Sequence, residues 1–167
     1  RVGWVAGGRY AEQISRLKLM TTISPSVPAQ AAIADYLQHG GYDRHLRSLR
    51  HALESQQASM LASAARHFPA DTRVTRPAGG YFLWFEFAPQ VDSLQLFKQA
   101  LAEGISLAPG PIFSATRGFG HCARLNYGHP WDAASEAAMA VLGERLLDNA
   151  WLYAGPPDPS LDRSRGP

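Results

Sequence analysis

Two arginines stand beside apolar segments that have the composition of strands. Arg124 lies in the middle of CARLNYG, with apolar neighbours on both sides. A charge in such a place is costly unless it is paired, and two explanations fit it. One is an internal salt bridge or a position at a sheet edge; the other is a guanidinium fork for a ligand carboxylate. Arg1, which leads into VGWVA, is either a solvated terminus or a site for a phosphate or carboxylate. The residues alone leave both alternatives open.

Other residue types that could do chemistry do not form a site. His39, His45 and His51 are each six residues apart, which on a helix separates successive members by about 240°. Neither this spacing nor any other in the chain is that of a zinc site. Cys122 is the only cysteine, so an internal disulfide is excluded, and a lone buried thiol is more often a core residue than a nucleophile. We therefore expect no metal site, and no G-x-S-x-G segment anchors a hydrolase triad.

Composition places the 167 residues among ordinary globular domains. Apolar residues make up 46% and charged residues 18%, and the formal net charge is only +2. This charge is too small to argue for direct binding to nucleic acid or to a membrane surface. No apolar run approaches the roughly 18 residues of a membrane span, and no secretory signal is recognisable. With a single cysteine, a cytoplasmic location is expected.

Apolar periodicity and the positions of glycine and proline predict alternating helices and strands. In chain order we expect a strand over 2–6, helices over 10–20, 29–39 and 42–68, strands over 72–76 and 81–87, a helix over 94–101, strands over 105–110 and 121–128, and a helix after Asp132. The segment YFLWFEF is apolar on both faces apart from Glu86, which suggests burial between two layers.

Apolar spacing also marks the last two helices. Leu94, Phe97 and Leu101, spaced three and four residues apart, predict the penultimate helix, which Gly104 closes, and Met139, Leu142 and Leu146 would lie on one face of the last one.

The second half of the predicted order suits two-layer α/β packing. The first predicted strand has no partner sheet, although its backbone groups need one. We therefore expect the chain to be part of something larger, and to be poorly soluble or partly unfolded by itself.

Five segments occur in an order that resembles one family. They are RVGWVAGG, SVPAQAAIADYLQHGGYDRHLRSLR, RPAGGYFLWFEF, LAPGPIFS and ARLNYGH. Together they resemble the C-terminal portion of class I, fold-type-I aminotransferases, which depend on pyridoxal 5'-phosphate (PLP). GGYDRHLRSLR and PAGGYFLWFEF look most like the MocR-type regulators, in which a GntR-type winged helix-turn-helix precedes an aminotransferase-like domain. The resemblance implies an α/β, PLP-dependent transferase-like fold: the last large-domain strand and helices plus the α/β small domain.

The resemblance also gives roles to residues. Arg1 matches the arginine that holds the cofactor phosphate, and Arg124 matches the one that binds the substrate α-carboxylate. Ser24 or Ser26 matches a polar residue that reaches the phosphate across the dimer interface. The lysine that forms the Schiff base would lie upstream of Arg1, so the chain itself holds no catalytic residue and should be inactive alone.

The implied domain organisation has three parts. Residues 1–41 would end the PLP-binding large domain, residues 42–151 would be the long connecting helix and the small domain, and residues 152–167 would be a disordered tail.

The function that the resemblance implies is that of a PLP-binding effector domain in a DNA-binding transcription regulator. Its ligand would be an amino acid or amine, the intact protein would be a cytoplasmic homodimer, and DNA would be bound only through a missing N-terminal domain, with no membrane partner. Two alternatives remain: a stand-alone aminotransferase acting on an amino acid and a 2-oxo acid, and an α/β interaction module whose arginines are structural.

Overall fold

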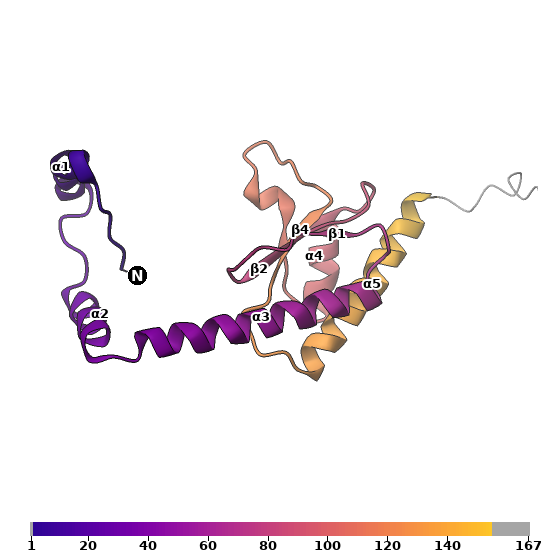
Figure 1. The fold of residues 1–167 in the computed structure, drawn as a ribbon. Helices are drawn as coiled ribbons and strands as arrows, with labels where there is room; N and C mark the ends of the chain where they lie inside the picture. The colour runs from indigo at the N-terminus through magenta and orange to yellow at the C-terminus, as the bar shows by residue number, and fades with distance from the viewer. Residues whose placement is uncertain (1, 155–167) are drawn as a thin grey trace, which may run out of the picture. The chain divides into compact units, whose positions relative to one another are not determined.

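The computed structural model of the chain describes residues 2–154, and side chains as far as residue 148. Its elements are η1 (Gly8–Tyr10), α1 (Ala11–Thr21), α2 (Val27–His39), α3 (Tyr42–His67), β1 (Arg73–Val74), β2 (Phe82–Glu86), α4 (Ser93–Ala102), β3 (Ala108–Pro109), η2 (Gly110–Phe113), β4 (Cys122–Asn126) and α5 (Ala133–Ala154). They form two units that divide between Leu49 and Arg50, inside α3 (Figure 1).

The N-terminal unit contains η1, α1, α2 and the first turns of α3. α2 carries Pro28 in its first turn, where the missing N–H leaves no hydrogen bond unmade. The helices predicted here are confirmed, but the strand expected over residues 2–6 is not formed. No other strand lies in the described part of this unit, so the backbone of an extended segment would have no ladder partner. No described residue of this unit is buried, and large side chains such as Trp4 and Met20 are exposed.

The second unit is built on a four-stranded antiparallel sheet with the order β1-β2-β4-β3. β2 and β4 are its two central strands, and Leu83 lies opposite Leu125 and Phe85 opposite Ala123. These four residues are buried, and they join a core to which α3, α4 and α5 contribute. Figure 1 shows α4, α5 and the C-terminal part of α3 beside this sheet. The core residues are Met60, Ala64, Phe68, Leu83, Phe85, Phe87, Val91, Leu96, Ala100, Leu107, Ala123, Leu125, Tyr127, Met139, Leu142 and Leu146.

α5 begins at the cap that the sequence predicts, and it contacts the C-terminal end of α3. The Asp132 carboxylate accepts hydrogen bonds from the backbone N–H and the hydroxyl of Ser135, which satisfies a free donor of the first turn. Gly143 is buried where α5 meets the end of α3, and an added Cβ there would lie 2.2 Å from the carbonyl oxygen of His67. The Glu136 carboxylate joins the same helices: it accepts hydrogen bonds from Arg66 (2.8 and 2.9 Å) and contacts His67 Nε2 at 2.8 Å.

The three residues placed on one face of α5, Met139, Leu142 and Leu146, are buried. Of the three that mark α4, Phe97 packs against the core, whereas Leu94 and Leu101 are 40% and 53% exposed, and Leu96 and Ala100 are buried instead. Asp92 caps α4 by accepting from the backbone N–H groups of Leu94 and Gln95. The small side chain of Ala100, one turn after Leu96, suits the close approach of α4 to α5 and β3.

The prediction that β2 is buried on both faces is also wrong for the described residues. Leu83 and Phe85 point into the core and are buried, whereas Phe82, on the other face, is 41% exposed and Trp84 is half-buried. The physical reason is that the helices supply the core of only one sheet face. On the other face, β2 meets aromatic side chains from the segment 110–121.

Candidate functional site

The site begins with the alternation of side chains along β4. Ala123 and Leu125 point into the core, so Arg124 between them points to the opposite face. Its neighbours across the ladder are Trp84 on β2 and Ala108 on β3. β4 pairs with a strand on each side and is therefore not at the sheet edge, which removes one of the two structural explanations for this arginine.

Aromatic rings surround the Arg124 guanidinium. Its central carbon lies over the ring of Phe82, 4.0 Å from the centroid, and over the ring of Phe113, 4.6 Å from the centroid. Trp84 meets the ring of Phe113 edge-on at 5.6 Å. We call Phe82, Trp84, Phe113 and Arg124 the arginine face.

The positive charge of Arg124 is not neutralised by a carboxylate of the described residues. Within residues 2–154, no carboxylate lies at ion-pair distance from Arg124. The carboxylate on this side of β2, that of Glu86, is instead 3.5 Å from Arg73 and 3.8 Å from His121. The internal salt bridge, the second structural explanation, is therefore not formed in the described part of the chain.

The segment 110–121 carries Phe113 and folds tightly on itself. Gly110 is buried, and a Cβ there would lie 2.1 Å from the carbonyl oxygen of Phe119, so that only glycine fits. The Ser114 hydroxyl oxygen accepts hydrogen bonds from the backbone N–H groups of Thr116 (3.3 Å) and Gly118 (3.0 Å). These contacts bring the start and end of the segment together beside β4.

Two residues of this segment adopt a conformation that favours glycine. Arg117 and Phe119 have φ values of 57° and 61°, and non-glycine residues rarely adopt the left-handed region. The ring of Phe119 meets Trp84 edge-on at 5.6 Å. Such strain persists only where the surrounding contacts hold it, and it is concentrated at ligand sites and switch regions.

The other candidate residues from the sequence lie elsewhere. Arg1 is outside the described residues, and Ser24 and Ser26 belong to the N-terminal unit. Lys18 and Lys98, the only lysines, lie exposed on α1 and α4. The second unit therefore offers no lysine for a Schiff base beside the arginine face, and its described residues by themselves do not fit PLP. What they supply is the guanidinium of Arg124, which has no ion-pair partner among the described residues.

Cys122 is a core residue, as the sequence predicts. It is 3% exposed, and burial, followed by the nearby Glu86 carboxylate, raises the pKa of its thiol. A raised pKa lowers the thiolate fraction at neutral pH, which makes this cysteine a poor nucleophile.

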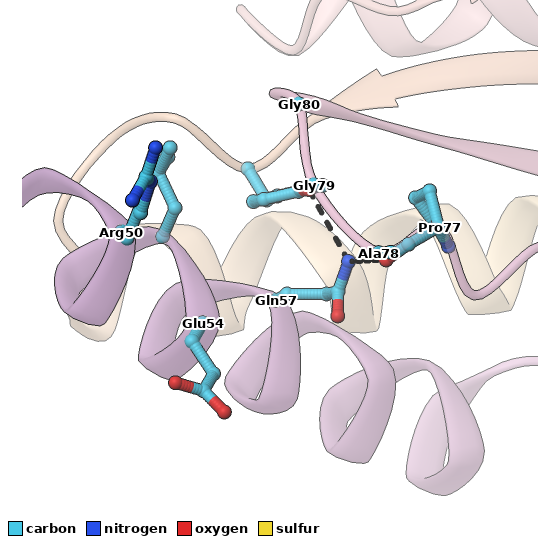
Figure 2. A pocket seen from close by; sticks show the side chains of 9 residues that line it. Arg50, Glu54, Gln57, Pro77, Ala78, Gly79 and Gly80 are labelled. Carbon is cyan, nitrogen blue, oxygen red and sulfur yellow. Dashed lines mark hydrogen bonds between the residues drawn. The ribbon is translucent and has the colours of Figure 1, made fainter. Parts of the chain in front are cut away.

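A hollow apart from the arginine face lies between α3 and the turn 77–80. Its volume is about 520 Å³, and Arg124 is not among the residues that line it. Figure 2 shows the Gln57 amide directed at the turn, where it donates to the carbonyl oxygen of Pro77 at 3.1 Å. The same amide donates to the hydroxyl of buried Tyr127 at 3.2 Å. Sequence reasoning did not single out Gln57, because the pairing joins residues 20 and 70 positions apart.

The sequence and the fold can be compared with those of known proteins. The family model described as aminotransferase class I and II matches residues 1–141. The chain belongs to this family. The resemblance inferred from the five sequence segments is thereby confirmed.

Curated relatives of this aminotransferase-family chain carry the names of transcription regulators. It is 39% identical over 148 residues to "Uncharacterized HTH-type transcriptional regulator YdcR" of Escherichia coli (strain K12), covering 89% of this chain and 32% of that protein. It is 35% identical over 147 residues to "Uncharacterized HTH-type transcriptional regulator YjiR" of the same organism, covering 87% and 31%. The chain thus spans about a third of the length of these relatives.

Solved structures of aminotransferases share the fold. The α-aminoadipate aminotransferase LysN of Thermus thermophilus, complexed with N-(5'-phosphopyridoxyl)-L-leucine, matches with a TM-score of 0.78 and 27% identity, over 89% of this chain and 38% of that chain. The kynurenine aminotransferase of Pyrococcus horikoshii matches with the same TM-score at 22% identity, over 86% and 36%, and supports the fold alone. The predicted fold class, an α/β fold-type-I transferase portion, is confirmed.

The described helices include none long and apolar enough to cross a membrane.

Proposed function

We propose that the chain is the C-terminal part of a PLP-binding, aminotransferase-like effector domain in a MocR/GntR-type transcription regulator that senses an amino acid or amine. In this proposal Arg124 binds the ligand carboxylate. The observation that carries it is a half-buried guanidinium on a central strand that has aromatic neighbours and no carboxylate partner within residues 2–154. The names of the relatives support the regulatory part.

PLP would be held mainly by residues outside this chain. When bound, it supplies an aldehyde carbon that condenses with amines and an electron sink for the bonds around them. Arg1, by its place before the segment VGWVA, would hold the cofactor phosphate. The described residues contribute orientation: a guanidinium with in-plane N–H groups fixes a carboxylate through two hydrogen bonds. Residues 1–41 would belong to the large domain, and residues 42–151 to the connecting helix and small domain.

The partners of the intact protein follow from the same proposal. It would be a cytoplasmic homodimer that binds DNA through an N-terminal domain outside this chain. Binding of the ligand would favour one arrangement of the domains and so alter DNA affinity, which requires different ligand affinities for the two arrangements.

The test uses the full-length, PLP-loaded protein and the proteinogenic L-amino acids as probes. The amino acid that changes cofactor absorption most is titrated into the wild type and into Arg124→Leu. Loss of a bidentate, charge-assisted pair should raise its Kd about 100-fold, while PLP itself stays bound. An unchanged Kd in Arg124→Leu, or no spectral response to any amino acid, would refute this role for Arg124.

A stand-alone aminotransferase is the second candidate, favoured by the 27% identity and TM-score of 0.78 to LysN. The two candidates differ in turnover and in DNA binding. Repeated conversion of an amino acid and a 2-oxo acid, without ligand-dependent binding to the promoter DNA beside the gene, would favour the enzyme. Ligand-dependent DNA binding would favour the regulator.

A further inference from the structure

The surroundings of Arg124 suggest how the guanidinium is held before a ligand arrives. An arginine side chain has several rotatable bonds, and ordering it at the moment of binding weakens affinity. No described carboxylate fixes this one through an ion pair. The contacts that the structure does show are with the rings of Phe82, at 4.0 Å, and Phe113, at 4.6 Å.

Contact with aromatic rings suits a guanidinium that must also bind an anion. The cation is attracted to the negatively polarised ring face, and stacking uses the flat face of the group. The N–H donors lie in the plane of the guanidinium, so stacking leaves them available to a carboxylate. A carboxylate partner within the chain would instead occupy those donors.

The two rings come from different elements. Phe82 belongs to the central strand β2, whereas Phe113 ends the short helix η2 at the start of the segment that contains the strained residues Arg117 and Phe119. Phe113 is also held from the side, by the edge-on contact with Trp84. Both rings remain about two-fifths exposed, so the packing of the core does not account for them.

We infer that Phe82 and Phe113 are positioning residues, which stack on the Arg124 guanidinium and hold its N–H donors ready for the ligand carboxylate. The inference rests on the proposed role of Arg124 and adds two residues to it. It makes the affinity for carboxylate ligands depend on two aromatic rings that need not touch the ligand.

The experiment again uses the full-length, PLP-loaded protein and the amino acid that gives the strongest change in cofactor absorption. Phe113→Leu and Phe82→Leu each remove one ring and keep an apolar side chain. Each should raise the Kd of that amino acid about 5- to 20-fold, the range of a partly desolvated cation–π contact. Phe113→Tyr keeps the ring and should restore wild-type affinity, which a general loss of packing would not allow.

Phe119→Leu is the matched control. Phe119 comes from the same segment and meets Trp84 at the same 5.6 Å centroid distance as Phe113, but it is not one of the rings over Arg124. Its replacement should leave the Kd unchanged. PLP affinity and the thermal melt are measured for every variant; if Phe113→Leu does not fold, Phe82→Leu on the strand carries the test.

The outcomes separate this inference from the proposed function. If Arg124→Leu weakens binding while Phe82→Leu and Phe113→Leu do not, the positioning role is wrong and the proposed function stands. Equal losses in Phe113→Leu and Phe119→Leu would also overturn the inference, because the effect would then come from the segment as a whole. If Arg124→Leu has no effect, both proposals fail.

Discussion

Adding one methyl group at Gly143 tests the contact between α3 and α5. A Cβ there would lie 2.2 Å from the carbonyl oxygen and 2.8 Å from the carbonyl carbon of His67. Ordinary contact begins at 3.4 Å, so the helices must separate by 3.4 − 2.2 = 1.2 Å. Overpacking costs about 1–3 kcal/mol. The upper end applies because the colliding atoms of His67 belong to the main chain and cannot rotate away.

The greater helix propensity of alanine offsets about 1 kcal/mol of this cost. The expected net destabilisation from Gly143→Ala is therefore about 2 kcal/mol, which makes cooperative opening about 30-fold more frequent. Hydrogen exchange of α3 and α5 peptides in the protein, measured at several urea concentrations, reports this opening locally.

Gly79→Ala is the control for Gly143→Ala. It makes the same chemical change in a turn where no atom lies within 4 Å of the new Cβ, and it should leave exchange in the two helices unchanged. If the amide hydrogens of α3 and α5 exchange in Gly143→Ala as slowly as in the wild type, or more slowly, the close contact between Gly143 and His67 is refuted.

Two further predictions concern titratable groups. Hydrogen bonds from Arg66 and then His67 lower the pKa of Glu136 from 4.5 to about 2, so its stabilising contribution is complete above pH 4.5 and is lost as the pH falls through about 2. Glu136→Gln should therefore lower the urea midpoint at pH 6 and by less at pH 3; an equal difference at both values would contradict this. Cys122 should react with iodoacetamide at neutral pH far more slowly in the folded protein than in urea, because burial raises the pKa of its thiol and blocks access. Alkylation at the same rate in both states, followed by mass spectrometry, would show that the thiol is accessible.

Much of the secondary structure can be predicted from the sequence, because it depends on residues close together in the chain. Capping residues, prolines and glycines determine where helices begin and end, and the apolar periodicity of α3 predicts its length. Asp132 caps α5 as predicted. The spacing of Leu94, Phe97 and Leu101 identifies α4 but not its buried face, because Leu96 and Ala100 are as helical in spacing as Leu94 and Leu101. Only the tertiary neighbours decide which pair is buried.

The site was only partly accessible to sequence reasoning. Arg124 could be recognised because a charge among apolar residues of a strand needs a partner. Its aromatic neighbours could not be recognised. Phe82 comes from a different strand and Phe113 from the short helix η2, and their contacts depend on the register of β2 with β4 and on the folding of the segment 110–121. Gly110 gives that segment its close approach, but its sequence context resembles that of any glycine-containing turn.

The alternation of side chains between the two faces of β4 also disfavours a wrong strand register in the sheet. β2 is apolar on both faces over Phe82 to Phe85, so its hydrophobic pattern does little to distinguish the native alignment from one shifted by a single position. A slip by one residue exchanges the two faces of a strand. In β4 such a slip would turn Arg124 toward the apolar core, where an unpaired charge is costly. The residue proposed to recognise the ligand therefore also penalises the wrong strand alignment, so that selection for binding and selection for correct folding act on the same side chain.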